Sequence, residues 1–211
     1  MALVAGVPFL EIILRQLRAC GIREVVLGTG YRAEQIEEYF RNGARLGLSI
    51  DYSREPEPLG TAGAVKLAEP MLGDPTLILN GDSFANWSLT DLLRIYREKQ
   101  ATTVMALQSV LDVSRYGSVA VDEDGRVTEF VEKGARIGPG LINAGVYVIQ
   151  KQIVRDLPKA TPISLEREVF PRLLGGNLHG VISQGDFIDI GIPADLERAQ
   201  TLFAGHGQFG R

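Results

Sequence analysis

Cysteine is almost absent from this chain of 211 residues, and Cys20, standing alone, cannot form a disulfide within it. Long apolar runs are missing too, because no stretch approaches the roughly 18 consecutive apolar residues of a membrane span. Residues 1–15 lack a basic residue ahead of their apolar stretch, and Glu11 interrupts it, which argues against a signal peptide. We therefore expect a cytoplasmic protein that does not associate with membranes.

The chain also has no excess of positive charge, because it contains 22 Lys and Arg residues and 26 Asp and Glu residues, which gives a net charge of −4. Nucleic-acid binders usually carry a basic patch, and a single Trp87 with six tyrosines offers no stacking array for bases. The two histidines, His179 and His206, are expected at the surface, and neither has a Cys or His at metal-ligand spacing. Small molecules remain as the expected partners, and a homo-oligomer stays open.

Alternating short apolar strands and amphipathic helices predict an α/β layer fold. Strands are expected at 25–27, 48–52, 76–79, 103–110, 142–149, 181–182 and 187–188, and helices at 8–19, 33–40, 61–67, 90–99, 153–157, 165–174 and 193–203. An Asp-Gly turn at 124–125 predicts a β-hairpin over 119–131. The uninterrupted apolar strand at 76–79 is typical of a parallel sheet covered on both faces. One domain over 1–211 is expected, with a flexible tail at 204–211.

Two carboxylates follow apolar strands directly. Asp82 comes after the strand at 76–79 in Asn80-Gly81-Asp82, and Asp189 ends the strand at 187–188. Ligands of open parallel sheets bind beyond the carboxyl ends of the strands, and carboxylate oxygens suit Mg²⁺. If the fold brings the two together, they can hold a metal that bridges phosphates. An ordinary turn with an Asx hydrogen bond is the alternative for Asp82.

Three further segments combine small residues with polar ones. Gly60-Thr61 opens a helix, where Thr61 can cap the helix and its amino end favours a phosphate. Glu132-Lys133 follows the hairpin, where Glu132 can accept a hydrogen bond from a sugar hydroxyl and Lys133 can bind a phosphate. Asn143, beside two small residues of a buried strand, suggests a ligand lying against it. A capped loop-to-helix joint and a solvated surface pair are the ordinary alternatives for the first two.

A competing pattern, G-x-G-x-x-A, spans residues 28–33 after a strand and before a helix, and Asp51 follows about 20 residues later, as in a dinucleotide-binding fingerprint. It predicts a nicotinamide oxidoreductase instead. Nothing later in the chain supplies a redox site, and this interpretation leaves the other segments unexplained.

Taken in order, these segments resemble the sugar-1-phosphate nucleotidyltransferases, the enzymes that make nucleoside-diphosphate sugars. The resemblance covers about residues 2–203 and includes VVLGTGYRAEQIEEYF, REPEPLGTAGAVKLA, LILNGDSF, YGSVAVDEDGRVTEFVEKG, LINAGVYVI, SLEREVFPRLL and FIDIGIPADLERAQ. The most similar subgroups are the heptose-1-phosphate and mannose-1-phosphate guanylyltransferases. The family resemblance implies a Rossmann-like, three-layer α/β/α sandwich with a mostly parallel central sheet and an inserted β-hairpin.

The resemblance also implies a reaction and a site. An oxygen of a sugar 1-phosphate attacks the α-phosphorus of a nucleoside triphosphate, GTP being favoured, and pyrophosphate leaves. By this resemblance, two aspartates bind the metal ion, three small residues bind the nucleotide and four residues bind the sugar. By the same resemblance, Lys133 binds the phosphate of the sugar 1-phosphate. In full, these residues are Asp82 and Asp189 for Mg²⁺, Gly60, Thr61 and Gly81 for the nucleotide, and Glu132, Asn143, Gly145 and Glu166 for the sugar.

The family also begins with a strand, a glycine-rich loop with a basic residue and a Pro-Lys pair, all ahead of the segment that matches Met1-Ala2. This loop grips the triphosphate. By family analogy and ordinary loop lengths, we expect the chain to be N-terminally truncated by about 25 residues. A catalytically inactive remnant that binds sugar phosphate or nucleotide is the alternative.

Overall fold

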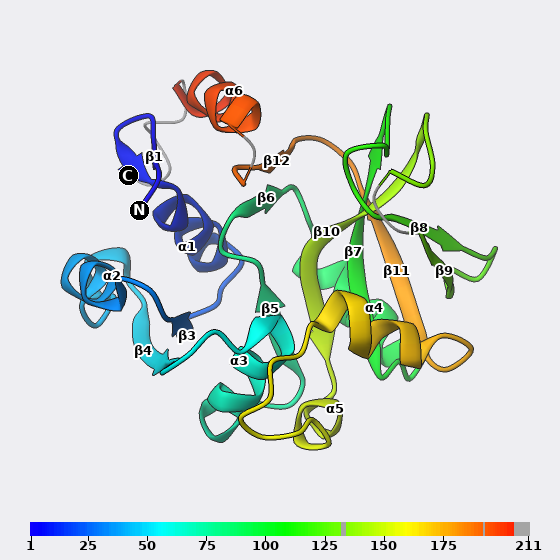
Figure 1. Cartoon of the computed structure of the whole chain (residues 1–211), viewed down its shortest axis with the longest axis horizontal. Coiled ribbons are helices and arrows are strands. Elements are labelled where there is room, and N and C mark those ends of the chain that lie inside the picture. The colour runs from blue at the N-terminus through cyan, green and yellow to red at the C-terminus, as the bar shows by residue number, and fades with distance from the viewer. Residues whose placement is uncertain (132–133, 192, 205–211) are drawn as a thin grey trace. The chain divides into compact units, whose positions relative to one another are not determined.

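The computed structural model describes residues 1–131, 134–191 and 193–204 (Figure 1). The chain divides into two units. Unit 1 comprises residues 1–58, 81–84 and 188–211, and unit 2 comprises residues 59–80 and 85–187. Of the expected tail at 204–211, Ala204 is the last residue of a helix, and residues 205–211 lie outside the described residues.

Unit 1 is built around one amphipathic helix and a pair of parallel strands. Its elements are the hairpin β1 (Leu3–Val4) and β2 (Val7–Pro8), α1 (Phe9–Ala19), β3 (Glu24–Thr29), α2 (Ala33–Phe40), the 3₁₀ turn η1 (Ala44–Leu46), β4 (Ser49–Arg54) and α6 (Pro193–Ala204). Strands β3 and β4 pair in parallel. The ring of Phe203 on α6 makes edge contacts with Phe9 at 6.3 Å and with Phe84 at 5.0 Å between ring centroids, which ties α6 to α1.

Unit 2 contains a six-stranded sheet. Its strands are β5 (Thr76–Leu79), β7 (Thr103–Val110), β8 (Ser118–Val121), β9 (Val127–Val131), β10 (Gly140–Ile149) and β11 (Leu178–Ser183). Strand β10 pairs with β5, β7 and β8, so it is the strand around which this sheet is organised. Strands β6 (Ser83–Ala85) and β12 (Phe187–Asp189) pair with each other outside this sheet, and most of their residues belong to unit 1.

Helices and turns complete unit 2. They are α3 (Gly60–Ala68), the 3₁₀ turn η2 (Glu69–Met71), α4 (Leu89–Glu98), α5 (Lys151–Arg155), the π-helical turn η3 (Leu165–Val169) and the 3₁₀ turn η4 (Phe170–Leu173). Helix α4 contacts β7, β10 and β11, whereas α3 contacts η3 and α5. The core between α3, η3 and the sheet contains Tyr147, Phe170 and Leu165, none of them more than 1% exposed.

The α/β class and the hairpin are confirmed, with β8 and β9 joined by a turn in which Gly125 N donates to Asp122 O. The expectation of a mostly parallel sheet is wrong for the six-stranded sheet. Only β11 and β7 are parallel there, because β10 runs antiparallel to each of its partners. An unbroken apolar run reports burial on both faces of a strand but not its direction, so the sequence could not exclude this pairing.

The expectation of a surface position for His179 is also wrong, since this residue is 2% exposed. It lies on β11, which pairs with β7 on one side and meets Arg126 through a single bridge on the other. The adjacent Gly180 is itself a strand residue and packs against Leu107. Burial lowers the pKa of His179, and the nearby charges of Arg126 and Lys99 lower it further.

A buried carboxylate organises the first helix of unit 1. Glu11 on α1 is 1% exposed, and its Oε1 accepts hydrogen bonds from Arg15 at 2.6 and 3.0 Å. Its Oε2 accepts from Tyr39 at 2.9 Å and Arg45 at 2.8 Å. Burial opposes the charge of Glu11, but the hydrogen bonds from Arg45, Arg15 and Tyr39 outweigh it and lower the pKa. These bonds link α1 to α2 and to η1.

We predict that Glu11→Gln lowers the free energy of unfolding by about 1–3 kcal/mol at neutral pH, because it removes hydrogen bonds to a charged group. A lowered pKa means that this stabilisation is complete above the ordinary value of 4.5 and is lost as the pH falls below it. Urea unfolding between pH 3 and 7 should therefore show a gap between variant and wild type that closes in acid. Glu38→Gln, an exposed change on α2, is the control. Equal stabilities at pH 7 would contradict the role of Glu11.

We predict that His179 makes the protein less stable as the pH falls. Since the folded state lowers its pKa, the unfolded state binds the proton more readily, and stability is complete above the ordinary value of 6.5 and decreases below it. His179→Gln cannot take up this proton and should flatten the dependence of the urea midpoint on pH between 7.5 and 5.5. His206→Gln serves as the control for losing a histidine. A slope in His179→Gln as steep as in the wild type would refute the prediction.

Candidate functional site

The carboxylate of Glu166, on η3 of unit 2, accepts hydrogen bonds from three hydroxyl groups. Thr61 donates to Oε2 at 2.7 Å and Ser164 donates to the same oxygen at 2.9 Å. Tyr147 donates to Oε1 at 3.2 Å. In the part of the chain that the structure describes, each hydrogen bond to this carboxylate comes from a neutral hydroxyl. The arrangement joins α3, β10 and η3 at one half-buried carboxylate.

Asn143 continues the same network along β10. Its Nδ2 donates to the hydroxyl oxygen of Tyr147 at 2.7 Å, and its Oδ1 accepts from the backbone N of Gly145 at 2.9 Å. Residues four apart on a regular strand are separated by about 13 Å. The side chains meet because the register of β10 against β7 shifts between Asn143 and Tyr147, where Gly145 adopts a φ of +74°.

Gly145 is therefore required by the backbone and by its neighbour Asn80. A Cβ at Gly145 would lie 2.9 Å from the side-chain nitrogen of Asn80, whose backbone N donates to Gly145 O at 2.8 Å. The family resemblance implied sugar binding at Gly145, and that role stays a prediction. In the structure the side chain of Asn80 lies against this glycine, so Asn80 and β10 define each other's position within unit 2.

Thr61 has a different local role from the one expected. The residue that caps α3 is Leu59, without a side-chain hydrogen bond, so the expected capping by Thr61 is wrong. The Thr61 hydroxyl accepts from Leu165 N at 2.8 Å and donates to Glu166, and both bonds fix η3 against the start of α3. Capping needs an extended residue ahead of the first turn, whereas Thr61 is the second residue of the helix.

Gly60, which precedes it, has a φ of +69°, and a Cβ there would lie 2.7 Å from the carbonyl oxygen of Ile163. That carbonyl accepts from Ala62 N at 2.9 Å, at the amino end of α3. The glycine thus allows the segment leading into η3 to approach the helix. Gly81, by contrast, has open space where a Cβ would be, so a ligand can reach its backbone.

Asp82 and Asp189, 107 positions apart in the sequence, are brought together in unit 1. The backbone N of Ile190 donates to Asp82 O at 2.9 Å, next to the pairing of β6 with β12. Asp82 is exposed and accepts from Ser83 Oγ at 3.2 Å, and the half-buried Asp189 accepts from Gly191 N at 2.9 Å through Oδ1. Two carboxylates are thus offered at neighbouring strand ends.

Within the described residues, no group of three or more His, Cys, Asp and Glu side chains could enclose a metal ion. The two aspartates still fit one kind of ion. Mg²⁺ is usually bound through one or two carboxylates together with substrate phosphates and water, rather than by a complete protein cage. An exposed Asp82 beside Asp189 matches that pattern.

The remaining expectations have different outcomes. Glu132 and Lys133 lie outside the described residues, so their roles stay predictions. Sequence reasoning missed Tyr147 and Ser164, which donate to Glu166. Ser164 does not match the capping-box pattern, because that pattern requires Glu or Gln three residues after the serine, whereas Arg167 stands there and Glu168 comes one residue later. Tyr147 carried no signal, because an aromatic residue in an apolar strand is most simply a core residue.

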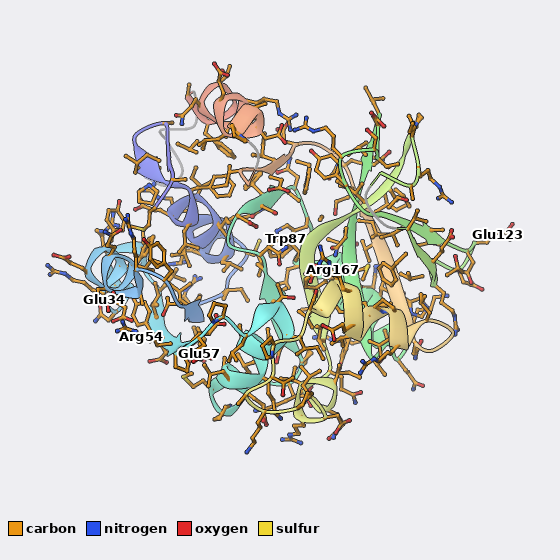
Figure 2. The ribbon with its side chains drawn as sticks, viewed as in Figure 1. Glu34, Arg54, Glu57, Trp87, Glu123 and Arg167 are labelled. Carbon is orange, nitrogen blue, oxygen red and sulfur yellow. The ribbon has the colours of Figure 1, made fainter. Side chains whose placement is uncertain are left out.

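The dinucleotide interpretation does not fit unit 1. Asp51 pairs with Val26 in the middle of β4, rather than at the carboxyl end where the fingerprint requires an acidic residue. That end carries Arg54, which forms an ion pair with Glu34 of α2, and the two side chains lie side by side in Figure 2. A basic residue paired with the helix occupies the place of the ribose-binding acid.

A cavity of about 690 Å³ also lies in unit 1, against α2 and the turn that follows it. Tyr39 and Arg45, both partners of Glu11, line it together with Arg41. It contains none of the residues that the sequence predicted for the site.

No helix among the described residues is long and apolar enough to cross a membrane.

Comparison with curated proteins gives a consistent set of relatives. The chain is 39% identical over 202 residues to a D-glycero-alpha-D-manno-heptose 1-phosphate guanylyltransferase of Aneurinibacillus thermoaerophilus, covering 95% of this chain and 86% of that protein. The corresponding protein of Campylobacter jejuni is 37% identical over 92% of this chain and 86% of its own length. A mannose-1-phosphate guanylyltransferase of Mycobacterium tuberculosis is 36% identical over 93% of this chain, which spans only 56% of that relative.

Solved structures agree with these relatives. HddC from Yersinia pseudotuberculosis, solved as a complex with GMP-PN, has a TM-score of 0.87 and 31% identity, covering 96% of this chain and 88% of that one. A glucose-1-phosphate thymidylyltransferase structure from Bacillus anthracis, described there as putative, shares the fold with a TM-score of 0.83 at 21% identity, covering 99% of this chain and 87% of that one. These nucleotidyltransferases have a Rossmann-like fold, which agrees with the fold class expected from the sequence. The nucleotidyl transferase family model matches residues 1–204, and the chain belongs to this family.

Proposed function

We propose that this protein transfers a guanylyl group from GTP to a mannose- or heptose-type sugar 1-phosphate. An oxygen of the sugar phosphate forms a bond to the α-phosphorus of GTP, the bond from that phosphorus to the bridging oxygen breaks, and pyrophosphate leaves with the electron pair. The observation that supports this most strongly is the 37–39% identity to two heptose 1-phosphate guanylyltransferases over most of both chains. Such a reaction depends on alignment and charge neutralisation more than on covalent help from the protein.

On the sugar side, we assign hydroxyl recognition to Glu166 and Asn143 in unit 2. A half-buried carboxylate held by three hydroxyls is a fixed acceptor for a sugar hydroxyl. Gly145 supports both residues by bending β10. Glu132 and Lys133 follow β9 in the sequence, and we assign them a second hydroxyl and the sugar phosphate.

On the nucleotide side, we assign the binding of GTP to Gly60, Thr61 and Gly81. Helix amino ends favour anionic groups, and Gly60 and Thr61 form the amino end of α3. The open space at Gly81 lets a ligand approach the backbone. Asp82 and Asp189 would hold Mg²⁺, which supplies positive charge against the phosphates when bound. We place the reaction in the cytoplasm, and a homo-oligomer is compatible with it.

The proposal is tested by pyrophosphate release from GTP, ATP, UTP and dTTP, each offered with mannose 1-phosphate, D-glycero-α-D-manno-heptose 1-phosphate or glucose 1-phosphate. We expect release that requires both substrates and is fastest with GTP and a manno-configured sugar. Binding of both substrates without release would identify an inactive binding protein. Release with another nucleotide or sugar, and none with these, would reject the assigned substrates.

We predict that Asp82→Asn and Asp189→Asn each lower kcat at saturating Mg²⁺ by at least about 100-fold, because each loses a charge that stabilises the ion opposite the transferred group. Both changes preserve side-chain shape, so circular dichroism and urea unfolding should resemble the wild type. Asp186→Asn, an exposed position three residues before Asp189, is the matched control and should keep its activity. Near-normal turnover in either variant would remove that aspartate from the metal site.

A further inference from the structure

The hydroxyl of Tyr147 is an internal part of the network around Glu166. The tyrosine is 0% exposed, so its hydroxyl is held within the protein. It accepts a hydrogen bond from Asn143 Nδ2 at 2.7 Å and donates its own to Glu166 Oε1 at 3.2 Å. A hydroxyl that accepts a hydrogen bond becomes a better donor, because the bonds polarise each other. The hydrogen bonds therefore run from Asn143 to Tyr147 and from Tyr147 to Glu166, so that each donor points toward the carboxylate.

The two oxygens of Glu166 are used unequally. Oε2 accepts from Thr61 and Ser164, which occupies both of its lone pairs. Among the described residues Oε1 accepts from Tyr147 alone, so one lone pair stays available to a ligand. Because the side chain is half-buried, a ligand hydroxyl can reach it. The Tyr147 bond determines in which direction this remaining lone pair points.

We propose that Tyr147 is a positioning residue for sugar binding: it sets the orientation of Glu166 Oε1, so that this oxygen accepts from one hydroxyl of the sugar 1-phosphate. This inference rests on the proposed function and assigns to that site a residue that acts through another. Tyr147 itself does not touch the sugar. Asn143 contributes by keeping the tyrosine hydroxyl turned toward Glu166.

The packing of the Tyr147 ring allows a variant to separate the positioning role of the hydroxyl from the structural role of the ring. Its ring lies 4.8 Å from the ring of Phe170, centroid to centroid, inside the core of unit 2. Tyr147→Phe keeps these ring contacts and removes only the hydroxyl. Its effect should therefore appear in sugar binding, while the fold is retained.

The test is calorimetric titration of mannose 1-phosphate, or of D-glycero-α-D-manno-heptose 1-phosphate if the wild type binds it more tightly, with Mg²⁺-GTP titrated separately. The proteins are the wild type, Tyr147→Phe, Glu166→Gln and the double variant. Tyr52→Phe is the matched control, since its hydroxyl donates to Arg41 O in unit 1. We expect Tyr147→Phe to raise the Kd of the sugar 1-phosphate about 10-fold, as for a lost hydrogen bond to a charged group. Its Kd for GTP and its melting temperature should change little.

The double variant identifies the route of the effect. If Tyr147 acts through Glu166, adding Tyr147→Phe to Glu166→Gln should not weaken sugar binding further. Losses that multiply would mean that the tyrosine contacts the sugar itself, which overturns the positioning role. If the wild type binds the sugar 1-phosphate and Tyr147→Phe binds it equally well, this inference alone fails. If the wild type binds neither substrate, the proposed function fails and the inference falls with it.

Discussion

The bend of β10 at Gly145 is the constraint on which the geometry of unit 2 depends. Strand β10 is bonded to β5, β7 and β8, so its path positions most of the sheet. The left-handed backbone at Gly145 shifts the register and turns Asn143 toward Tyr147. Without this shift the two side chains would lie too far apart to bond, and Asn143 could not donate to the hydroxyl that reaches Glu166.

Polar groups buried in the two units are stabilised in different ways. In unit 1, Glu11 is neutralised by two arginines, and its lowered pKa reflects a carboxylate that the fold keeps charged. In unit 2, the hydrogen bonds that Glu166 accepts from the described residues come from hydroxyls, and no ion pair to it is formed by those residues. The first arrangement suits a structural link between helices. The second suits a ligand site, because the carboxylate keeps acceptor capacity for an incoming donor.

Sequence reasoning located the elements and many of the polar residues, but it could not provide their contacts. Strand-end segments such as Asn80-Gly81-Asp82 were recognisable because Gly and Asx residues interrupt apolar runs. The antiparallel direction of β10 and the burial of His179 were not, because both depend on partners distant in the sequence. Tyr147 was missed for the same reason, since its role arises from Asn143 and Glu166 rather than from its neighbours.

A crystal structure with mannose 1-phosphate, GTP and a non-catalytic divalent cation would test the central claim most directly. The account predicts that a sugar hydroxyl lies about 2.5–3.0 Å from Oε1 of Glu166, that Tyr147 still donates to that oxygen, and that the cation contacts Asp82 and Asp189. A sugar bound away from Glu166, or a Tyr147 hydroxyl turned away from it in the complex, would contradict the account.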